Sequence, residues 1–159
     1  MTIKHAELPQ RFNFAHHILT LNQGRKNKLA FRDDHREMSY GELDLKVRQF
    51  AAGLLAHGVQ AEQRILLVMH DSIDMPVAFL GALFAGVIPV PVNTLLPADN
   101  YAYMIKHSEA KMIVVSEALL ATVKEALTLA NQTMPVVVTG QTATSNETSF
   151  SALLEANPL

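Results

Sequence analysis

Two glycines have the spacing of a phosphate-binding loop. Gly81 and Gly86 are separated by four residues, but Val87 and Ile88 follow where such a loop has Lys and then Ser or Thr. Both glycines also fall late in a predicted helix, whereas phosphate is bound by backbone N–H groups at the start of one. We therefore expect Gly81 and Gly86 to allow close helix packing rather than to bind phosphate.

A hydroxyl-rich segment at residues 139–145 is a second place where phosphate could bind. It follows a predicted strand, and ligands of open α/β sheets bind beyond the carboxyl ends of the strands. Residues 140–148 contain no Lys or Arg, so no cation is present to balance phosphate charge. We expect this segment to be an exposed connecting loop.

The seven histidines do not have the spacing of a metal site. His16 and His17 are neighbours on a predicted helix, so their side chains diverge, and no His-x-His or His-x-x-x-His pair occurs. His57 and His107 lie near predicted helix carboxyl ends, where the helix dipole favours a cation. The chain has no cysteine, which excludes disulfides, thiolate zinc ligands and a thiol nucleophile.

His70, Asp71 and Ser72 follow a predicted strand and resemble part of a hydrolase site only superficially. They do not form the G-x-S-x-G turn that exposes a nucleophilic serine. We expect Asp71 or Ser72 to cap the next helix. Spacing alone therefore predicts no catalytic, cofactor-binding or metal-binding residue.

The elements that would position any site alternate between strand and helix from residue 39 onward. The predicted strands are continuously apolar, which is typical of parallel strands buried on both faces; they span residues 64–69, 87–92, 111–115 and 135–139. This order predicts an α/β fold with a mostly parallel sheet and helices on both faces. A short helix (14–22) and a hairpin (28–38) precede it.

Capping residues mark where several helices begin. Ser39, followed by Glu42 three residues later, has the pattern of a capping box. Asn13 and Ser116 are the predicted N-caps of two further helices. The last short helix should begin at Ser149 or Ser151.

Residues 75–98 contain no charge and could suggest a membrane span. Glycines at 81 and 86 and prolines at 89 and 91 interrupt the stretch, so two short buried elements explain it better. Since Pro89 and Pro91 cannot donate to a sheet, their strand should lie at an edge or a strand end.

Composition excludes several other classes. A length of 159 residues with 49% hydrophobic residues indicates one globular domain with a real core. A formal net charge of −2 gives no basic surface for nucleic acid. The first residues lack the apolar segment of a signal peptide, and the absence of cysteine suits a reducing compartment, so we expect a cytoplasmic protein.

Several segments resemble the adenylate-forming enzymes, also called AMP-dependent synthetases. Residues 38–43 (MSYGEL) resemble their first core motif, L-[ST]-Y-x-E-L, and residues 83–93 (LFAGVIPVPVN) resemble their second. Within this superfamily, residues 12–15 (FNFA), 92–96 (VNTLL) and 99–104 (DNYAYM) resemble the benzoate– and 4-hydroxybenzoate–CoA ligases.

The resemblance implies an activity for the family. These ligases activate an aromatic carboxylate with ATP and Mg²⁺, release pyrophosphate, and pass the acyl group to coenzyme A. Their phosphate loop, S-S-G-[ST]-T-G-x-P-K, is absent from the chain. The resemblance thus implies that residues 1–159 are a partial N-terminal domain, with the helix and hairpin in 1–38 and the βαβ region in 39–159. No catalytic, cofactor-binding or metal residue is carried over, and we expect the chain alone to be inactive.

Two further expectations remain. The alternative to a ligase segment is a free-standing α/β binding or interaction module without enzymatic activity. Apolar strands must be covered on both faces, so an incompletely covered unit should tend to self-associate.

Overall fold

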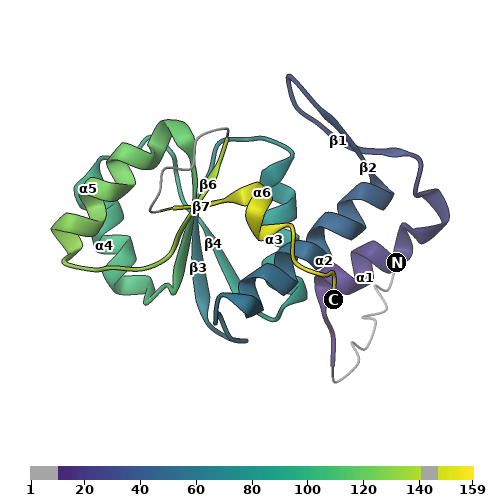
Figure 1. Ribbon diagram of the computed structural model, residues 1–159, viewed down its shortest axis with the longest axis horizontal. Coiled ribbons are helices and arrows are strands. Elements are labelled where there is room, and N and C mark those ends of the chain that lie inside the picture. Colours follow the sequence, from purple (N-terminus) through teal and green to yellow (C-terminus); the bar gives the residue numbers. More distant parts are fainter. Residues whose placement is uncertain (1–10, 141–146) are drawn as a thin grey trace, which may run out of the picture.

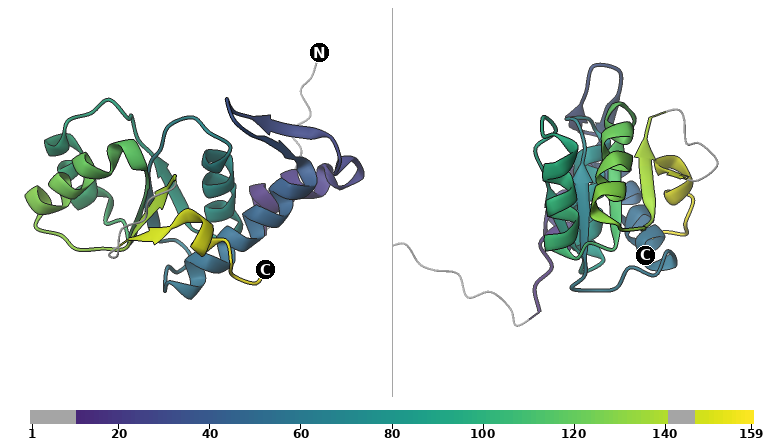
Figure 2. Two further views of the ribbon diagram at one scale, coloured as in Figure 1. Left: turned by 45° about the horizontal axis from the view of Figure 1, so that its top comes forward. Right: turned by 90° about the vertical axis from the view of Figure 1, so that its left-hand side faces the viewer.

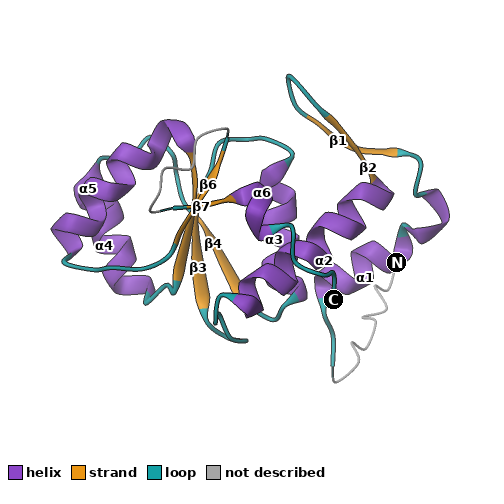
Figure 3. Ribbon diagram, viewed as in Figure 1, coloured by secondary structure: helices purple, strands orange, loops and turns teal. Residues whose placement is uncertain are grey.

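A computed structural model describes residues 11–140 and 147–159 of the chain. It contains a five-stranded sheet in the order β4-β3-β5-β6-β7 and a separate two-stranded hairpin (Figures 1 and 3). The strands are β1 (Leu29–Arg32), β2 (Glu37–Ser39), β3 (Arg64–Val68), β4 (Ile88–Pro91), β5 (Met112–Ser116), β6 (Val136–Thr139) and β7 (Thr148–Ser149). The α-helices are α1 (Phe14–Leu21), α2 (Tyr40–Ala56), α3 (Asp74–Phe84), α4 (Ala98–Ser108), α5 (Leu120–Ala130) and α6 (Phe150–Leu153).

Every strand pair in the larger sheet is parallel, and helices cover both faces. Ile65 and Leu67 of β3 face the core shared with α2, α3 and α6, whereas Leu66 and Val68 face the core shared with α4 and α5. In Figure 1 the sheet lies between α4 and α5 on one side and α2 and α3 on the other. The predicted α/β architecture is confirmed.

The proline-containing strand lies where its chemistry requires. β4 is at the edge of the sheet and pairs only with β3. The N–H groups on either side of the two prolines hold the strand there. Ile88 donates to the Gln63 carbonyl at 2.8 Å, and Val92 donates to the Leu67 carbonyl at 3.1 Å. Pro89 and Pro91, which have no N–H group, are tolerated because one side of an edge strand has no partner.

The predicted caps at Ser39 and Asn13 are confirmed. The Ser39 N–H donates to Glu42 Oε2 at 2.7 Å, and the Glu42 N–H donates to Ser39 Oγ at 3.3 Å. The bond from the Ser39 N–H, and after it the bond that the Ser39 hydroxyl donates to the same Oε2 at 2.8 Å, lower the pKa of the Glu42 carboxyl. Asn13 Oδ1 accepts from the His16 N–H at 2.9 Å, while its Nδ2 donates to the Leu83 carbonyl at 2.8 Å. Asn13 thereby fastens α1 to the carboxyl end of α3.

Three local expectations were wrong. Ser116 stands at the N-cap position of a 3-10 turn (Glu117–Leu119) that precedes α5, but its side chain makes no capping bond, because its hydroxyl accepts from the His70 N–H. No side chain of the preceding loop caps α3 in the way expected of Asp71 or Ser72. The loop expected over 140–148 ends in β7, which is too short and too polar for a sequence pattern to reveal. Residues 141–146 of that loop lie outside the described residues.

Glycines let α2 pack closely on its neighbours. A Cβ added at Gly81 would lie 2.7 Å from Cδ1 of Phe50, and one added at Gly53 would lie 2.5 Å from the Leu153 carbonyl oxygen. Gly86 has φ +76 and ends α3 in a conformation that other residues rarely adopt. Gly81 thus serves helix packing, as expected, and Gly86 serves a turn.

Within residues 11–140 and 147–159, no helix has both the length and the apolar character needed to cross a bilayer.

Replacing Gly53 with Ala tests the close approach of α2 and α6. We expect G53A to lower the free energy of unfolding by about 1 kcal/mol, because overpacking costs about 1–3 kcal/mol and the better helix propensity of Ala offsets up to about 1 kcal/mol. Urea unfolding measures the change.

The matched control is G24A, since nothing lies within 4 Å of a Cβ at Gly24. Its unfolding free energy should stay within about 0.5 kcal/mol of the unsubstituted chain. A G53A chain more stable than the original would contradict the packing constraint.

Candidate functional site

The topology of the sheet points to a crevice at the carboxyl ends of β3 and β5. These strands are neighbours, but β3 leads through α3 to β4 on one side, and β5 leads through α5 to β6 on the other. Ligands of open parallel sheets bind where adjacent connections diverge in this way. The His70 N–H donates to Ser116 Oγ at 2.9 Å and joins the two strand ends.

A cleft of about 750 Å³ opens at this edge of the sheet. The strand ends contribute polar residues to its lining, namely His70, Ser72, Ser116, Glu117, Thr139 and Gly140. Other elements contribute charged or ionisable residues, namely His35, Arg36, Lys46 and Asp74. We call this the strand-end cleft.

Arg36 joins the hairpin to α3 at the border of the cleft. Its Nη1 donates to Asp74 Oδ1 at 3.1 Å, and its Nη2 donates to Asp74 Oδ2 at 3.0 Å. This two-pronged geometry is the strong form of an arginine–carboxylate pair. The pKa of Arg36 is raised, first of all by the hydrogen bond to Asp74.

Asp33 adds a second carboxylate to the same junction. Its Oδ1 accepts from the N–H groups of His35 at 3.0 Å and Arg36 at 2.7 Å, and its Oδ2 accepts from the Ile73 N–H at 3.2 Å and from Arg36 Nη2 at 2.9 Å. The pKa of the Asp33 carboxyl lies well below its ordinary value, chiefly because the Ile73 N–H and then the His35 N–H bind the charged form. Asp33 therefore caps α3 from a distant element. We call Asp33, Arg36, Ile73 and Asp74 the hairpin clasp.

The structure groups the histidines differently from their sequence spacing. His35 and His70 both line the strand-end cleft. His57 caps α2 with its ring Nδ1 at 2.8 Å from the Gly53 carbonyl oxygen, as its predicted place at a helix end suggested. His107 lies in the last turn of α4 and stacks on Tyr103 with ring centroids 5.4 Å apart.

The cleft does not contain an activated nucleophile among the described residues. No hydrogen bond between them joins the hydroxyl of Ser72, Ser116 or Thr139 to a histidine ring or a carboxylate. Nucleophilic catalysis requires such a link to a base.

The described residues of the cleft also do not fit a magnesium nucleotide. A Cβ built at Gly140 would lie 2.7 Å from Oε2 of Glu117, so a carboxylate stands at the strand end where phosphate would approach. Arg36, the guanidinium in the cleft lining, is bound by Asp33 and Asp74, and the charge of the other lining cation, Lys46, acts on Glu42. Across residues 11–140 and 147–159, no group of three or more His, Asp or Glu side chains could hold a metal ion.

The strand-end cleft and the hairpin clasp were not predicted from the sequence. One signal was present: His70 and Ser116 each stand at the end of a predicted parallel strand, and such ends meet at one edge of a sheet. Nothing in the sequence pairs Arg36 with Asp74, which is 38 residues away.

The chain matches a known enzyme family over most of its length. The family model "AMP-binding enzyme" matches residues 20–158. A 4-hydroxybenzoate–CoA/benzoate–CoA ligase of Rhodopseudomonas palustris is 43% identical over 91 residues, covering 57% of this chain and 17% of that ligase. A benzoate–CoA ligase of Thauera aromatica is 38% identical over 112 residues, covering 69% of this chain and 21% of that ligase.

A solved structure is similar over most of the chain. The benzoate CoA ligase from Burkholderia xenovorans LB400 superposes with a TM-score of 0.86 and 43% sequence identity, covering 93% of this chain and 29% of that one. The chain thus spans only 17% and 21% of the length of the two curated ligases.

Replacing Asp33 with Asn tests the hairpin clasp. We expect D33N to lower the free energy of unfolding at about pH 7, because the folded state stabilises the charged form of the Asp33 carboxyl. The folded pKa lies below the ordinary value of 3.8, so this stabilisation is complete above that value and is lost as the pH falls through the folded pKa. The difference between the two chains should therefore shrink below about pH 4, as urea unfolding at several pH values will show.

D34N is the control, because the Asp34 side chain makes no hydrogen bond or ion pair with another described residue. Its stability should follow that of the original chain at every pH. A D33N deficit that stayed constant down to about pH 2 would contradict the role of the Asp33 charge.

Proposed function

Because this chain belongs to the AMP-binding enzyme family, we propose that it is the N-terminal part of an aromatic acid–CoA ligase of the benzoate type. Its partial domain would comprise residues 1–38, with the helix and hairpin, and residues 39–159, with the βαβ region. The observation that carries the proposal is the 43% identity to a benzoate CoA ligase over 93% of the chain.

We propose that the complete ligase uses an aromatic carboxylate, ATP with Mg²⁺, and coenzyme A. A carboxylate is a poor electrophile, and an adenylate supplies it with a leaving group before transfer to the thiol. Donors and cations around the phosphates are needed for that chemistry. The described residues do not supply such a set, so we assign those contacts to polypeptide outside these 159 residues.

The contribution proposed for this chain is to hold the scaffold. In the first motif, Ser39 and Glu42 form a capping box that starts α2. In the second, Gly86 turns the chain from α3 into β4. These residues orient the parallel strands whose carboxyl ends form the strand-end cleft. The cytoplasmic location stays a prediction.

The isolated chain should not catalyse the reaction. We expect no benzoate-dependent release of pyrophosphate above the rate without protein when the 159 residues are supplied with ATP, Mg²⁺ and benzoate, because the phosphate contacts are missing. A coupled pyrophosphate assay measures this. Turnover by the isolated chain would overturn the assignment of the contacts to other polypeptide.

The proposed activity itself is tested on the longest reading frame that contains the chain. Its product should form benzoyl-CoA or a hydroxybenzoyl-CoA, detected by mass spectrometry, in preference to acetyl-CoA. A reading frame that stops after codon 159 and yields no thioester would favour the alternative, a free-standing binding module.

A further inference from the structure

The tip of the hairpin, residues 31–37, separates the strand-end cleft from another cavity. This cavity has a volume of about 620 Å³ and lies between the hairpin and the first half of α3. We call it the hairpin groove. Residues 31–34 line the groove, residues 35 and 36 line the cleft, and Ser72 lines both. The wall between the two cavities is therefore the place where the tip meets the start of α3.

The tip gains little stability from the hydrophobic core. Among residues 31–37 no side chain is buried, Asp33 is half-buried, and Phe31 is 40% exposed. At the base of the hairpin, by contrast, Met38 is 1% exposed, and Ala30 packs against the same core. Figure 2 shows the hairpin projecting beyond the sheet. The base is thus anchored by apolar burial, whereas the tip needs another kind of attachment.

The hairpin clasp supplies that attachment. Arg36 donates two hydrogen bonds to Asp74, at 3.1 and 3.0 Å, and the Ile73 N–H donates to Asp33 Oδ2 at 3.2 Å. Each of these bonds involves a charged group, which makes it stronger than a neutral one. The Arg36 side chain is nevertheless 45% exposed, so water competes for it. The clasp can therefore break while the core beneath it stays buried.

A β-bulge at the base of the hairpin provides a hinge. Leu29 pairs with Ser39, and the next pair joins Phe31 to Met38. Ala30 is therefore an extra residue on β1. Such a residue interrupts the hydrogen-bonded ladder and bends its strand. The ladder beyond the bulge is short, and an isolated two-stranded hairpin is only marginally stable. Bending at the bulge therefore costs the hairpin few of its own contacts.

We propose that the hairpin is a hinged strap, which the hairpin clasp holds closed and which opens by bending at the bulge. In the closed form, the tip keeps the hairpin groove and the strand-end cleft apart. In the open form, the tip leaves α3 and the two cavities become one. The clasp joins residues of this chain alone, so the motion is a property of the chain whatever lies against the groove. It does not depend on the proposed ligase activity.

Amide hydrogen exchange detects the opening in the unsubstituted chain. The Ile73 N–H is held by Asp33 of the clasp, whereas the Ile113 N–H donates to the Pro135 carbonyl at 3.1 Å within the sheet. After correction for intrinsic rates, Ile73 should exchange at least about a hundredfold faster than Ile113, because opening of the strap exposes no core. Low concentrations of urea should accelerate exchange at Ile113 and leave the rate at Ile73 nearly unchanged.

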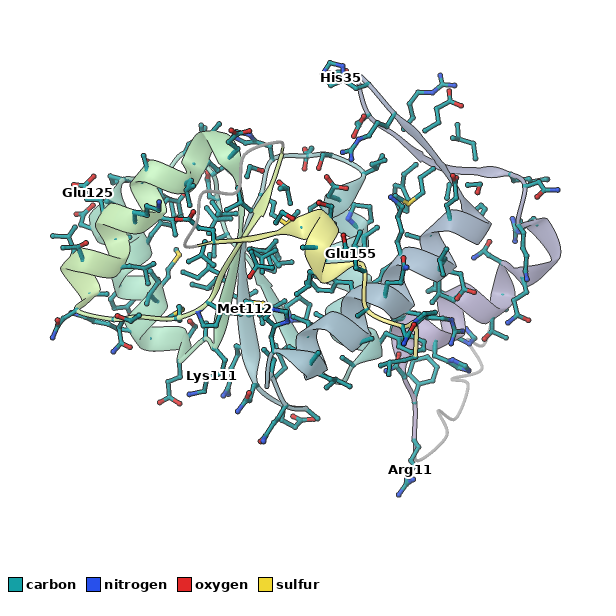
Figure 4. All side chains as sticks on the ribbon, in the orientation of Figure 1. Arg11, His35, Lys111, Met112, Glu125 and Glu155 are labelled. Carbon is teal, nitrogen blue, oxygen red and sulfur yellow. The ribbon has the colours of Figure 1, made fainter. Side chains whose placement is uncertain are left out.

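Two spin labels measure the position of the tip. The chain has no cysteine, so H35C and E125C place one label on the hairpin and one on α5, at positions that lie far apart in Figure 4. R36E puts a third carboxylate beside Asp33 and Asp74, and the repulsion should make the open strap the main form. Double electron–electron resonance should then show a distance distribution that is broader than, and displaced from, that of the chain with Arg36.

R32E is the matched control. Arg32 lies on the same hairpin and pairs with Glu37, so R32E makes the same change of charge and leaves the clasp intact. The distance distribution of the doubly labelled R32E chain should match that of the chain with both arginines. A displacement in R36E alone would show that the clasp, rather than the charge of the hairpin, holds the strap closed.

Either of two results would overturn the proposal. The first is an Ile73 amide with the same protection and the same urea dependence as Ile113, because the tip would then open only when the whole chain unfolds. The second is a folded R36E chain whose distance distribution matches that of R32E. The exchange measurement needs no substitution, so it decides the question even where R36E fails to fold.

Discussion

Burial of the central strands on both faces is the constraint on which the rest of the structure depends. Successive side chains of β3 point to opposite cores, and Ile65, Leu66, Leu67 and Val68 are each at most 1% exposed. Such a strand is stable only when helices cover both sides of the sheet. The chain therefore alternates between strand and helix, with α2, α3 and α6 on one face and α4 and α5 on the other.

Parallel strands covered in this way leave their carboxyl ends as the place for polar groups. The strand-end cleft is the consequence, and the hairpin clasp closes one side of it. The backbone N–H of Ile73 needs an acceptor at the start of α3, and Asp33 supplies it from the hairpin. One charged group thus satisfies a helix terminus, binds Arg36 and fixes the position of a two-stranded hairpin that would be marginal alone.

Membership of the AMP-binding enzyme family fits a division of labour along the polypeptide. One of the two motifs that indicate the family starts a helix at Ser39, and the other ends a helix at Gly86. Both motifs therefore act by setting the direction of the backbone. The same residues are informative in a sequence because caps and turns restrict residue type strongly. This explains how a segment can identify its family while the cleft contains no activated nucleophile among the described residues.

The sequence by itself determined the fold class, the edge position of the proline-containing strand, the caps at Asn13 and Ser39, and the family. All of these follow from periodicity, backbone chemistry or local motifs, which act over a few residues. Only the tertiary structure decided that Ser116 accepts from His70, that Asp33 rather than Asp71 or Ser72 caps α3, and that β7 exists. Those interactions join residues tens of positions apart, and several acceptors could satisfy each donor until folding fixes which one lies within hydrogen-bond distance.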